Sequence, residues 1–465
     1  MSGSFASLNT ALSALRYNRV AMDTASQNIA NVDTEGYTRR RVEAATAGTP
    51  TTPAMWSRNQ NAGGGVRVSG VTRMTDAFLD ARVRTEHGKQ SYADVRQAVL
   101  DRLETGIGEP GENGLSAVMA EFRSAWSDLA NNPDSEAARS QVLARGAALA
   151  DAVQIQARNF SVEAGDQRAK LTAMVSEVNA IAGDLAATNK AISVAQLDGS
   201  DAGNLLDQRD LLALRLSELT GGKAVQNGAG GLDFAVNGVP LVTGAIPGAL
   251  DIASGVTATA DSDGNPVTFS VTHPVGGTTA VPAGVTGGTG AVTDMLNTTV
   301  PAYVAALGSV AKSVADGVNA VHATGYDEAG AAGGPFFDYD PADPAGSLKI
   351  LITDKALVAA SGLPGGVVDG SVADRLSELR APETSYQQLV NGFGATVASG
   401  RRLAASQSML TEQVAGARDQ LAGVSLDEEM LAMVQYQRGF EAASRVLTTV
   451  DSVLDTLINR TGLLR

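Results

Sequence analysis

The sequence predicts an elongated, mainly α-helical protein of the α+β class, with helices from both chain ends and a small β domain inserted mid-chain. Apolar residues recur at alternating spacings of three and four near both termini, which is the period of a coiled-coil seam. Hydrophobic residues make up 44% of the 465 residues and aromatic residues only 4%, which suits long, closely packed helices. Between residues 222 and 290, short alternating runs rich in Gly, Val and Thr indicate strands instead.

Each end of the chain predicts a helix with one apolar stripe. The N-terminal stripe consists of Phe5, Leu8, Leu12, Leu15, Arg19, Met22, Ser26 and Ile29. The C-terminal stripe consists of Phe440, Ala443, Leu447, Val450, Leu454 and Leu457, and is widened by Val446 and Val453. Ser425 is the expected cap of the C-terminal helix, because carboxylates follow in its first turn. The stripes fit either a coiled-coil seam that serves assembly or two amphipathic helices of an ordinary bundle, and both alternatives stay open.

A helical body follows the N-terminal helix. Residues 91–130 predict two helices around a loop at Gly106–Gly114. Asn132 is the expected N-cap, and Pro133 the expected first position, of a long helix that ends near residue 197. At 1.5 Å per residue this helix would be roughly 95 Å long. Its candidate bends are Gly146, Gly165 and Gly183.

The β domain is expected to begin after a further helix near 204–219. Its first inward-facing positions, Leu232, Phe234 and Val236, lead to Asn237-Gly238, a strong signal for a tight hairpin. A turn at Asp263–Asn265 separates two more expected strands, at 256–260 and 267–271.

Helical patterns return at 292–321 and from about 372 to the end, with a short mixed segment around Phe336-Phe337 and 348–353. We therefore divide the chain into a terminal helical domain (1–40 and 425–465), a helical rod domain (41–221, 291–335 and 372–424), a small outer β domain (222–290) and a short mixed segment (336–371).

Composition excludes several kinds of chemistry. The chain has no cysteine, so disulfides and thiolate sites are impossible. Its net charge of −15 argues against a nucleic-acid binder, which needs a basic face. No apolar run approaches the roughly 20 residues needed to cross a bilayer. Arg16, Arg19 and Asp23 interrupt the apolar residues of the N-terminus, so we expect no cleavable secretory signal and no membrane partner.

Candidate catalytic and metal-binding residues do not form constellations. His87, His273 and His322 are isolated in sequence and lack the spacing of zinc ligands. The run Gly106–Gly111 formally matches a dinucleotide fingerprint, but it follows a helix and contains Glu109, so a loop is the better interpretation. Ser309 and Lys312 match a serine–lysine pattern without any companion motif.

Two acidic segments suggest calcium. Asp261, Asp263 and Asn265 begin like a calcium loop, but Pro266 replaces the required glycine, so we interpret the segment as a turn. The second segment, with Asp338, Asp340 and Asp343, fits either a solvated loop or a weak calcium site. We expect no cofactor and no enzymatic activity.

Two runs, from Asn28 to Tyr37 and from Leu426 to Asn459, resemble motifs of the family of flagellar rod, hook and junction proteins. The first is the run from Asn28 to Tyr37, whose signature positions are Asn28, Asn31, Thr34, Gly36 and Tyr37. Physically it is a helix end followed by a turn in which Gly36 can take a positive φ. Asp33 stands where asparagine is common. The second motif runs from Leu426 through Tyr436 to Asn459.

Interior motifs separate the members of that family. The runs 131–133, 138–139, 204–210, 318–322 and 325–327, together with Phe336-Phe337, are similar to the helical region of the hook-associated protein 1 family. Hook proteins have mainly β interiors, so this helical stretch disfavours them. Longer relatives carry a further β insertion after the Phe-Phe pair, where this chain has only a short acidic loop. The resemblance therefore implies one outer domain at most.

What the resemblance implies is an extracellular structural subunit of the bacterial flagellum. It would form a ring of identical subunits between the hook protein and hook-associated protein 3, at the hook–filament junction. Export would use the flagellar type III pathway with a cytoplasmic chaperone. The alternatives are a hook or distal-rod subunit and, from a distant class, a cell-wall hydrolase carried on an axial protein.

Overall fold

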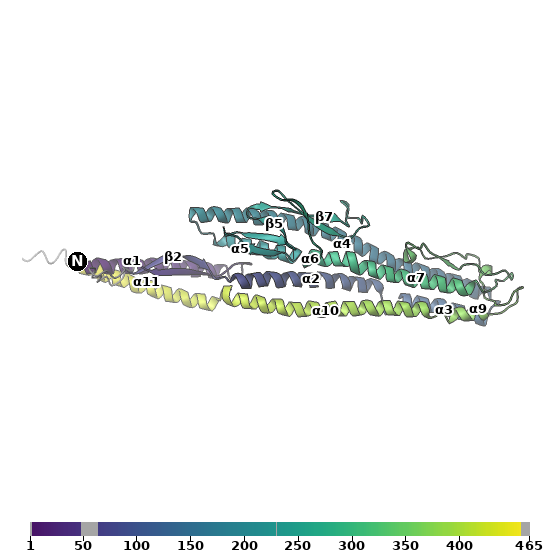
Figure 1. Ribbon diagram of the computed structural model, residues 1–465. Helices are drawn as coiled ribbons and strands as arrows, with labels where there is room; N and C mark the ends of the chain where they lie inside the picture. The colour runs from purple at the N-terminus through teal and green to yellow at the C-terminus, as the bar shows by residue number, and fades with distance from the viewer. Residues whose placement is uncertain (1, 48–63, 229, 457–465) are drawn as a thin grey trace, which may run out of the picture.

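The computed structural model describes residues 2–47, 64–228 and 230–456, and it has the shape of a long rod (Figure 1). At one end, the terminal helices α1 (Ser2–Ala30) and α11 (Leu426–Asp455) lie side by side with a two-stranded hairpin, β1 (Arg40–Thr46) and β2 (Val66–Arg73). The rest of the rod is a helical body with the remaining strands on one side. The predicted fold class, mainly helical and elongated, is confirmed.

Long helices build the body. They are α2 (Ala77–Ile107), α3 (Leu115–Asn131), α4 (Glu136–Asp198), α5 (Gly203–Thr220), α7 (Val300–His322) and α10 (Ala381–Ala422). Shorter helices are α6 (Gly287–Asp294), a π-helical turn (Met295–Thr299), α8 (Pro344–Ser347), a 3₁₀ turn (Lys355–Leu357) and α9 (Ser371–Ser377). Helix α2 packs between α10 and α5, and α5 in turn packs against α4.

The start of α4 corrects one prediction. Ser135, not Asn132, is the N-cap, and its hydroxyl accepts the backbone N–H of Ala138 at 3.2 Å. Pro133 lies in the preceding turn, where its carbonyl accepts a hydrogen bond from Arg139. The proline therefore belongs to the turn that the arginine holds, and the helix begins three residues later than expected.

Helix α4 continues unbroken for 63 residues through all three candidate bends. Gly146 serves packing, because a Cβ there would lie 2.9–3.1 Å from Ile350, Phe336 and Phe122. At Gly165 and Gly183 a Cβ would meet nothing within 4 Å, so those glycines are tolerated in a helix that tertiary contacts hold straight.

The middle strands form two antiparallel sheets. The first has the order β3 (Lys223–Gln226), β4 (Leu232–Val236), β5 (Val239–Thr243) and β6 (Ile246–Pro247). The second has the order β7 (Ala249–Ser254), β8 (Thr268–His273) and β9 (Gly277–Ala280). The predicted hairpin at Asn237-Gly238 is confirmed, since both residues have positive φ, 45° and 88°, between paired strands.

The expected strand at 256–260 is wrong. Strand β7 ends at Ser254, and the chain turns at Gly255, whose φ is 89° and whose N–H donates to the Asp263 carboxylate. A Cβ at Gly255 would lie 2.5 Å from the backbone of Val267, so the chain just before β8 leaves no room for a side chain at this position. The strand in this region is β7, which precedes the turn, and residues 256–260 form a loop.

The hairpin of β1 and β2 corrects the expectation of a helical segment from residue 41. These strands pair antiparallel from Arg40 with Arg73 to Thr46 with Val66. Their exposed faces carry arginine and threonine, so the apolar signal is weak. The alternation of Val66 and Val68 with polar residues is the period-two pattern that could have revealed them.

Aromatic side chains gather in the body's core. Phe122, Trp126, Phe336 and Phe337 form one cluster, with neighbouring ring centroids 4.9–6.1 Å apart. Phe160 stacks on Tyr303 at 4.0 Å farther along α4. The Phe-Phe pair is placed by the short pairing of β10 (Phe337–Asp338) with β11 (Lys349–Ile350). These aromatic contacts pack α3, α4 and α7 together in the core of the body.

Candidate functional site: the joint between the terminal helices and the body

Asn28, in the last turn of α1, is the centre of the joint. Its side chain is 1% exposed and makes four hydrogen bonds. The amide nitrogen donates to the carbonyl of Arg40 at 2.9 Å and to the carboxylate of Glu429 at 3.1 Å. The amide oxygen accepts the Arg40 N–H at 3.0 Å and the Tyr37 hydroxyl at 2.9 Å. One amide therefore links α1, the following turn, β1 and α11.

The signature turn after α1 is held by its own backbone. The N–H of Thr34 donates to Asn31, and that of Tyr37 donates to Thr34, at 3.0 and 3.1 Å. Gly36 has a φ of 79°, while a Cβ there would make ordinary contact with Leu211 at 3.5 Å, so conformation rather than space favours glycine. Burial raises the pKa of Tyr37, whose hydroxyl therefore stays a neutral donor to Asn28.

Glu429 ties the two ends of the chain together. This carboxylate, in the first turn of α11, is 4% exposed and accepts from Asn28 and from Arg39 Nε at 2.7 Å. Arg39 also pairs with Glu428 at 2.8 Å, and its backbone N–H donates to Ala422 at the end of α10. Burial lowers the pKa of Arg39, but its bonds to Glu428 and Glu429 outweigh that effect and raise it.

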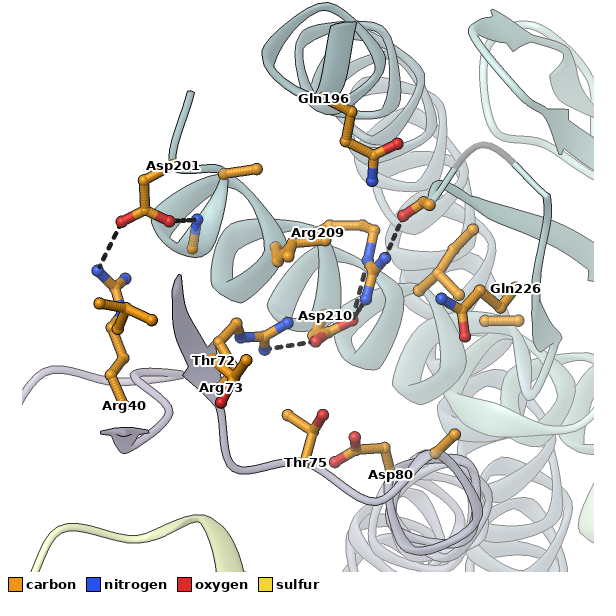
Figure 2. A pocket seen from close by; sticks show the side chains of 18 of the residues that line it. Arg40, Thr72, Arg73, Thr75, Asp80, Gln196, Asp201, Arg209, Asp210 and Gln226 are labelled. Atoms are coloured by element: carbon orange, nitrogen blue, oxygen red, sulfur yellow. Dashed lines mark hydrogen bonds and ion pairs between the residues drawn. The ribbon is translucent and has the colours of Figure 1, made fainter. Parts of the chain in front are cut away.

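A buried ion-pair network continues from the hairpin into α5. Arg40 lies 3.3 Å from Asp207 and also bonds Asn204. Arg73 lies 2.8 Å from Asp207 and 2.7 Å from Asp210. Figure 2 shows Arg73 and Asp210 facing each other beside Arg209, which also pairs with Asp210. Because breaking a buried pair leaves an uncompensated charge, this network should fix the hairpin firmly on the body.

The predicted apolar stripes lie beside the contact between α1 and α11. Fully buried positions of α1 are Ala11, Ala21, Thr24, Ala25 and Asn28, one residue before the predicted stripe or next to it. Small side chains let the helices approach closely, and the larger residues flank that contact. Half-buried stripe residues are Leu8, Leu15, Met22, Ile29, Leu447, Val450 and Leu454, whereas Leu12 and Phe440 are exposed. The side chain of Phe5 and all of Leu457 lie outside the described residues.

Residues considered for catalysis lie in structural positions. His322 is in the aromatic core, where its Nδ1 pairs with the Gly334 carbonyl and its Nε2 accepts the Ala359 N–H. Burial lowers the pKa of His322, which fits this neutral form. His87 faces Glu218 at 3.3 Å. The Ser309 hydroxyl donates to Ala305 within its own helix.

The acidic segment 338–343 begins at the end of strand β10 and continues as a loop. Asp338 pairs with Lys349 at 3.2 Å, and the carboxylate of Asp343 caps α8. Within the described ranges, no three His, Cys, Asp or Glu side chains gather closely enough to hold a metal ion. In the same part of the chain, no helix has both the length and the apolar character needed to span a bilayer.

Several residues of the joint were not predicted as site residues. Glu429, Arg39, Arg40, Arg73 and Asp207 carry its ion pairs. The pairs join residues 134 to 390 positions apart, and no local period reveals such partners. One signal in the sequence could have found them. The runs 28–37, 204–210 and 426–429, which resemble family motifs, supply most of the network and so point to a shared location.

A family model described as the flagellar hook-associated protein FlgK helical domain matches residues 100–337, slightly more than half of the chain. The chain belongs to this family. Two further models match the ends: the flagella basal body rod protein model at residues 8–38, and the C-terminal model of the flagellar basal body rod FlgEFG proteins at 420–460. Both end models fall on the segments that meet at the joint.

Three curated relatives are similar in sequence to this chain over 84–99% of its length. Flagellar hook-associated protein 1 of Bacillus subtilis is 29% identical, with 99% of each chain covered. The Escherichia coli protein of that name is 24% identical, with 97% of this chain and 99% of the relative covered. The protein of that name from Salmonella typhimurium is 26% identical over 84% of this chain and 72% of the relative.

A solved structure supports the fold. The flagellar hook junction protein FlgK from Burkholderia pseudomallei superposes with a TM-score of 0.64 at 16% identity, covering 74% of this chain and 100% of that chain. Family and relatives identify the FlgK-family chain as a structural subunit of the hook–filament junction of the bacterial flagellum. The alternative, a hook or distal-rod subunit, is not favoured.

Proposed function

We propose that this FlgK-family protein forms a ring of identical subunits at the distal end of the hook. The ring would receive hook-associated protein 3 and, through it, the filament. Its work is mechanical: the terminal helices pack into the inner wall of a tube, and the β sheets face outward. This division of roles follows the predicted domains, with the terminal helices in line with the body and the sheets on one side of it (Figure 1).

The observation that carries this proposal is the apolar surface left on the terminal helices. Leu8, Leu15 and Met22 on α1, and Leu447 and Leu454 on α11, remain half-exposed although the two helices already pack against each other. Full burial of such a side chain stabilises by roughly 1.5–3 kcal/mol. Neighbouring subunits in a tube could supply that burial. A helix pair that served only its own chain would gain nothing from keeping these residues large.

Localisation and export follow from the same role. We propose that the subunit is extracellular, leaves the cell by the flagellar type III pathway without a cleaved signal, and is held by a dedicated chaperone in the cytoplasm. The joint supports this order of events. Its ion pairs connect segments from both chain ends, so the terminal helices reach their final geometry only after the whole chain has been exported.

The test is a deletion strain examined by electron microscopy. We expect hooks without filaments, and flagellin shed into the medium, with filaments restored by a plasmid copy of the gene. Cells that lack hooks would instead indicate a rod or hook subunit, and normal filaments would remove the proposal.

A further inference from the structure

A cleft of about 850 Å³ opens beside the joint, and we call it the arginine cleft. It lies between the hairpin and the start of α2 on one side and α5 with β3 on the other (Figure 2). Its cationic lining residues are Arg40, Arg73, Arg84 and Arg209. Three aspartates, Asp80, Asp201 and Asp210, line the same cleft, so the pairing of each arginine decides where positive charge is left over.

Arg84 differs from the other three arginines. Arg40, Arg73 and Arg209 each pair with an aspartate of α5 or of the loop before it. Arg84 has neither an ion pair nor a hydrogen bond to any described residue, and the nearby Asp80 is taken by Arg418 at 2.8 Å. Although burial lowers its pKa, a guanidinium stays charged at neutral pH. The cleft therefore holds a half-buried cation with room for a carboxylate.

Apolar side chains form the rim of the arginine cleft. Val225 on β3 is 66% exposed, and Leu197, next to the lining residue Gln196 at the end of α4, is 87% exposed. Val71 on β2 adds to the same rim. A cation beneath exposed apolar residues fits a protein surface that offers carboxylates among apolar side chains, rather than a small hydrophilic anion.

A surface of that chemistry lies on the far side of α2. The corner where α10 meets α11, which we call the acidic corner, exposes Leu421, Leu426 and Leu431 together with Asp419 and Asp427. Leu431 is 72% exposed, and Asp427 makes no ion pair within the described part of the chain. The corner lies at the same height as the cleft, because Arg418 of α10 reaches across to Asp80, a residue of the cleft.

We propose that the arginine cleft of one copy receives the acidic corner of the next copy in the ring. The inference rests on the proposed ring. Two different, complementary surfaces of one molecule make a heterologous contact, and such contacts close into a ring when the rotation allows. Arg84 then gains a carboxylate such as Asp427, and the rim covers the exposed leucines of the corner. The contact would position neighbours side by side at the level of the joint.

Disulfide trapping tests the contact directly, because the natural chain has no cysteine. In intact flagella, oxidation of Val225→Cys combined with Leu431→Cys should give a ladder of covalent multimers of this chain. Each single variant should stay monomeric. The matched control, Val275→Cys with Leu431→Cys, places an equally exposed cysteine on the β8–β9 turn and should also stay monomeric.

A charge exchange provides the second measurement. Arg84→Glu should reduce the fraction of cells with filaments about tenfold or more, because a desolvated attraction becomes a repulsion. Adding Asp427→Arg to the same chain should restore most of that loss, while Asp427→Arg alone should impair assembly. The purified Arg84→Glu monomer should melt like the wild type.

Two results would overturn the proposed contact while leaving the junction role intact. One is filament-bearing cells in which the paired cysteines give no ladder, or link to a protein of different mass. The other is an Arg84→Glu defect that Asp427→Arg does not relieve. A deletion strain that still makes filaments would refute the junction role itself, which is a separate outcome.

Discussion

At the scale of single residues, Asn28 shows how a family signature acts physically. An asparagine amide carries two donors and two acceptor sites, and this one uses them on four partners from three segments. Aspartate would keep the shape but lose the donors and place a second carboxylate beside Glu429. Glutamine would not fit the same partners. The position therefore demands an amide of this length.

We predict that Asn28→Ala loosens the joint without unfolding the body. Four buried hydrogen bonds are lost and the Glu429 carboxylate loses a donor, which should cost about 2–4 kcal/mol locally. Amides of residues 31–41 should then exchange with solvent at least about 30-fold faster, as measured by mass spectrometry. Asn31→Ala is the matched control, because its side chain is only half-buried and bonds within its own turn. Equal exchange in both variants would contradict the role given to Asn28.

At the scale of elements, sequence patterns predicted the helices and turns whose stability depends on neighbouring residues. The helix periodicity located α3, α5, α10 and the second half of α2, and Asn237-Gly238 located a hairpin, because caps, glycines and apolar spacing act over a few residues. Helix α2 begins at Ala77, earlier than the expected start near residue 91. The start of α4 was missed because Arg139 holds Pro133 in the preceding turn, which is a tertiary contact. The hairpin of β1 and β2 was missed because its stability comes from Asn28, Asp207 and Asp210, far away in sequence.

On α1, the buried contact face lies about one residue from the predicted stripe, whereas on α11 the predicted stripe residue Ala443 is buried. Leu and Met carry the apolar signal in the sequence, but helices approach most closely over alanine, so Ala21 and Ala25 are buried and Met22 is not. Pattern reasoning weighs hydrophobicity, whereas packing at short distance selects small side chains. The large apolar residues beside this contact remain partly exposed, so their role in assembly can be tested by substitution.

We predict that Leu447→Asp with Leu454→Asp keeps the thermal unfolding of the helical body but abolishes filaments. Charges placed in a surface that neighbours cover are costly to bury without partners. Cells carrying the variant should export it and still lack filaments by electron microscopy. The control, Gln437→Asp with Thr448→Asp, adds the same charge at exposed polar positions of α11 and should leave filaments in place. A sharp fall in the melting temperature of the purified double variant would favour the ordinary-bundle interpretation.

At the scale of the whole molecule, the β sheets are bound to the body more closely than their glycine-flanked ends suggested. Three asparagines join the sheets to helices, each donating to and accepting from the backbone of one residue. Asn179 binds Leu250 in β7, Asn189 binds Leu232 in β4, and Asn297 binds Val267 just before β8. The sheets also share one continuous apolar core with α4. Many contacts therefore cross the boundary between sheets and body, because a glycine marks a turn and says nothing about packing beyond it.

The ends of this β segment nevertheless meet. Gly221 and Gly287 both have positive φ, and a Cβ on Gly287 would lie 2.5 Å from the nitrogen of Gly221. A short linker can therefore replace residues 224–286 without pulling the helices apart. Removal of residues 224–286 uncovers Leu185 and Ile192 of α4, which are fully buried in the complete chain.

We predict that replacing residues 224–286 with a short Gly-Ser linker lowers the melting temperature of the monomer but preserves filaments and swimming. The change removes Val225 and the β3 side of the arginine cleft, but Arg84 on α2 and the α5 side remain to hold the acidic corner of a neighbour. The destabilisation should come from the uncovered face of α4, since each exposed leucine or isoleucine forfeits about 1.5–3 kcal/mol. Adding Leu185→Gln and Ile192→Lys makes that face polar, so it should reduce aggregation of the shortened protein and separate folding from assembly. Filaments in both shortened strains would place the assembly contacts on the terminal helices and the joint. Loss of filaments in the polar-faced variant, with its helical body folded by circular dichroism, would show that the sheets themselves contact a neighbour in the junction.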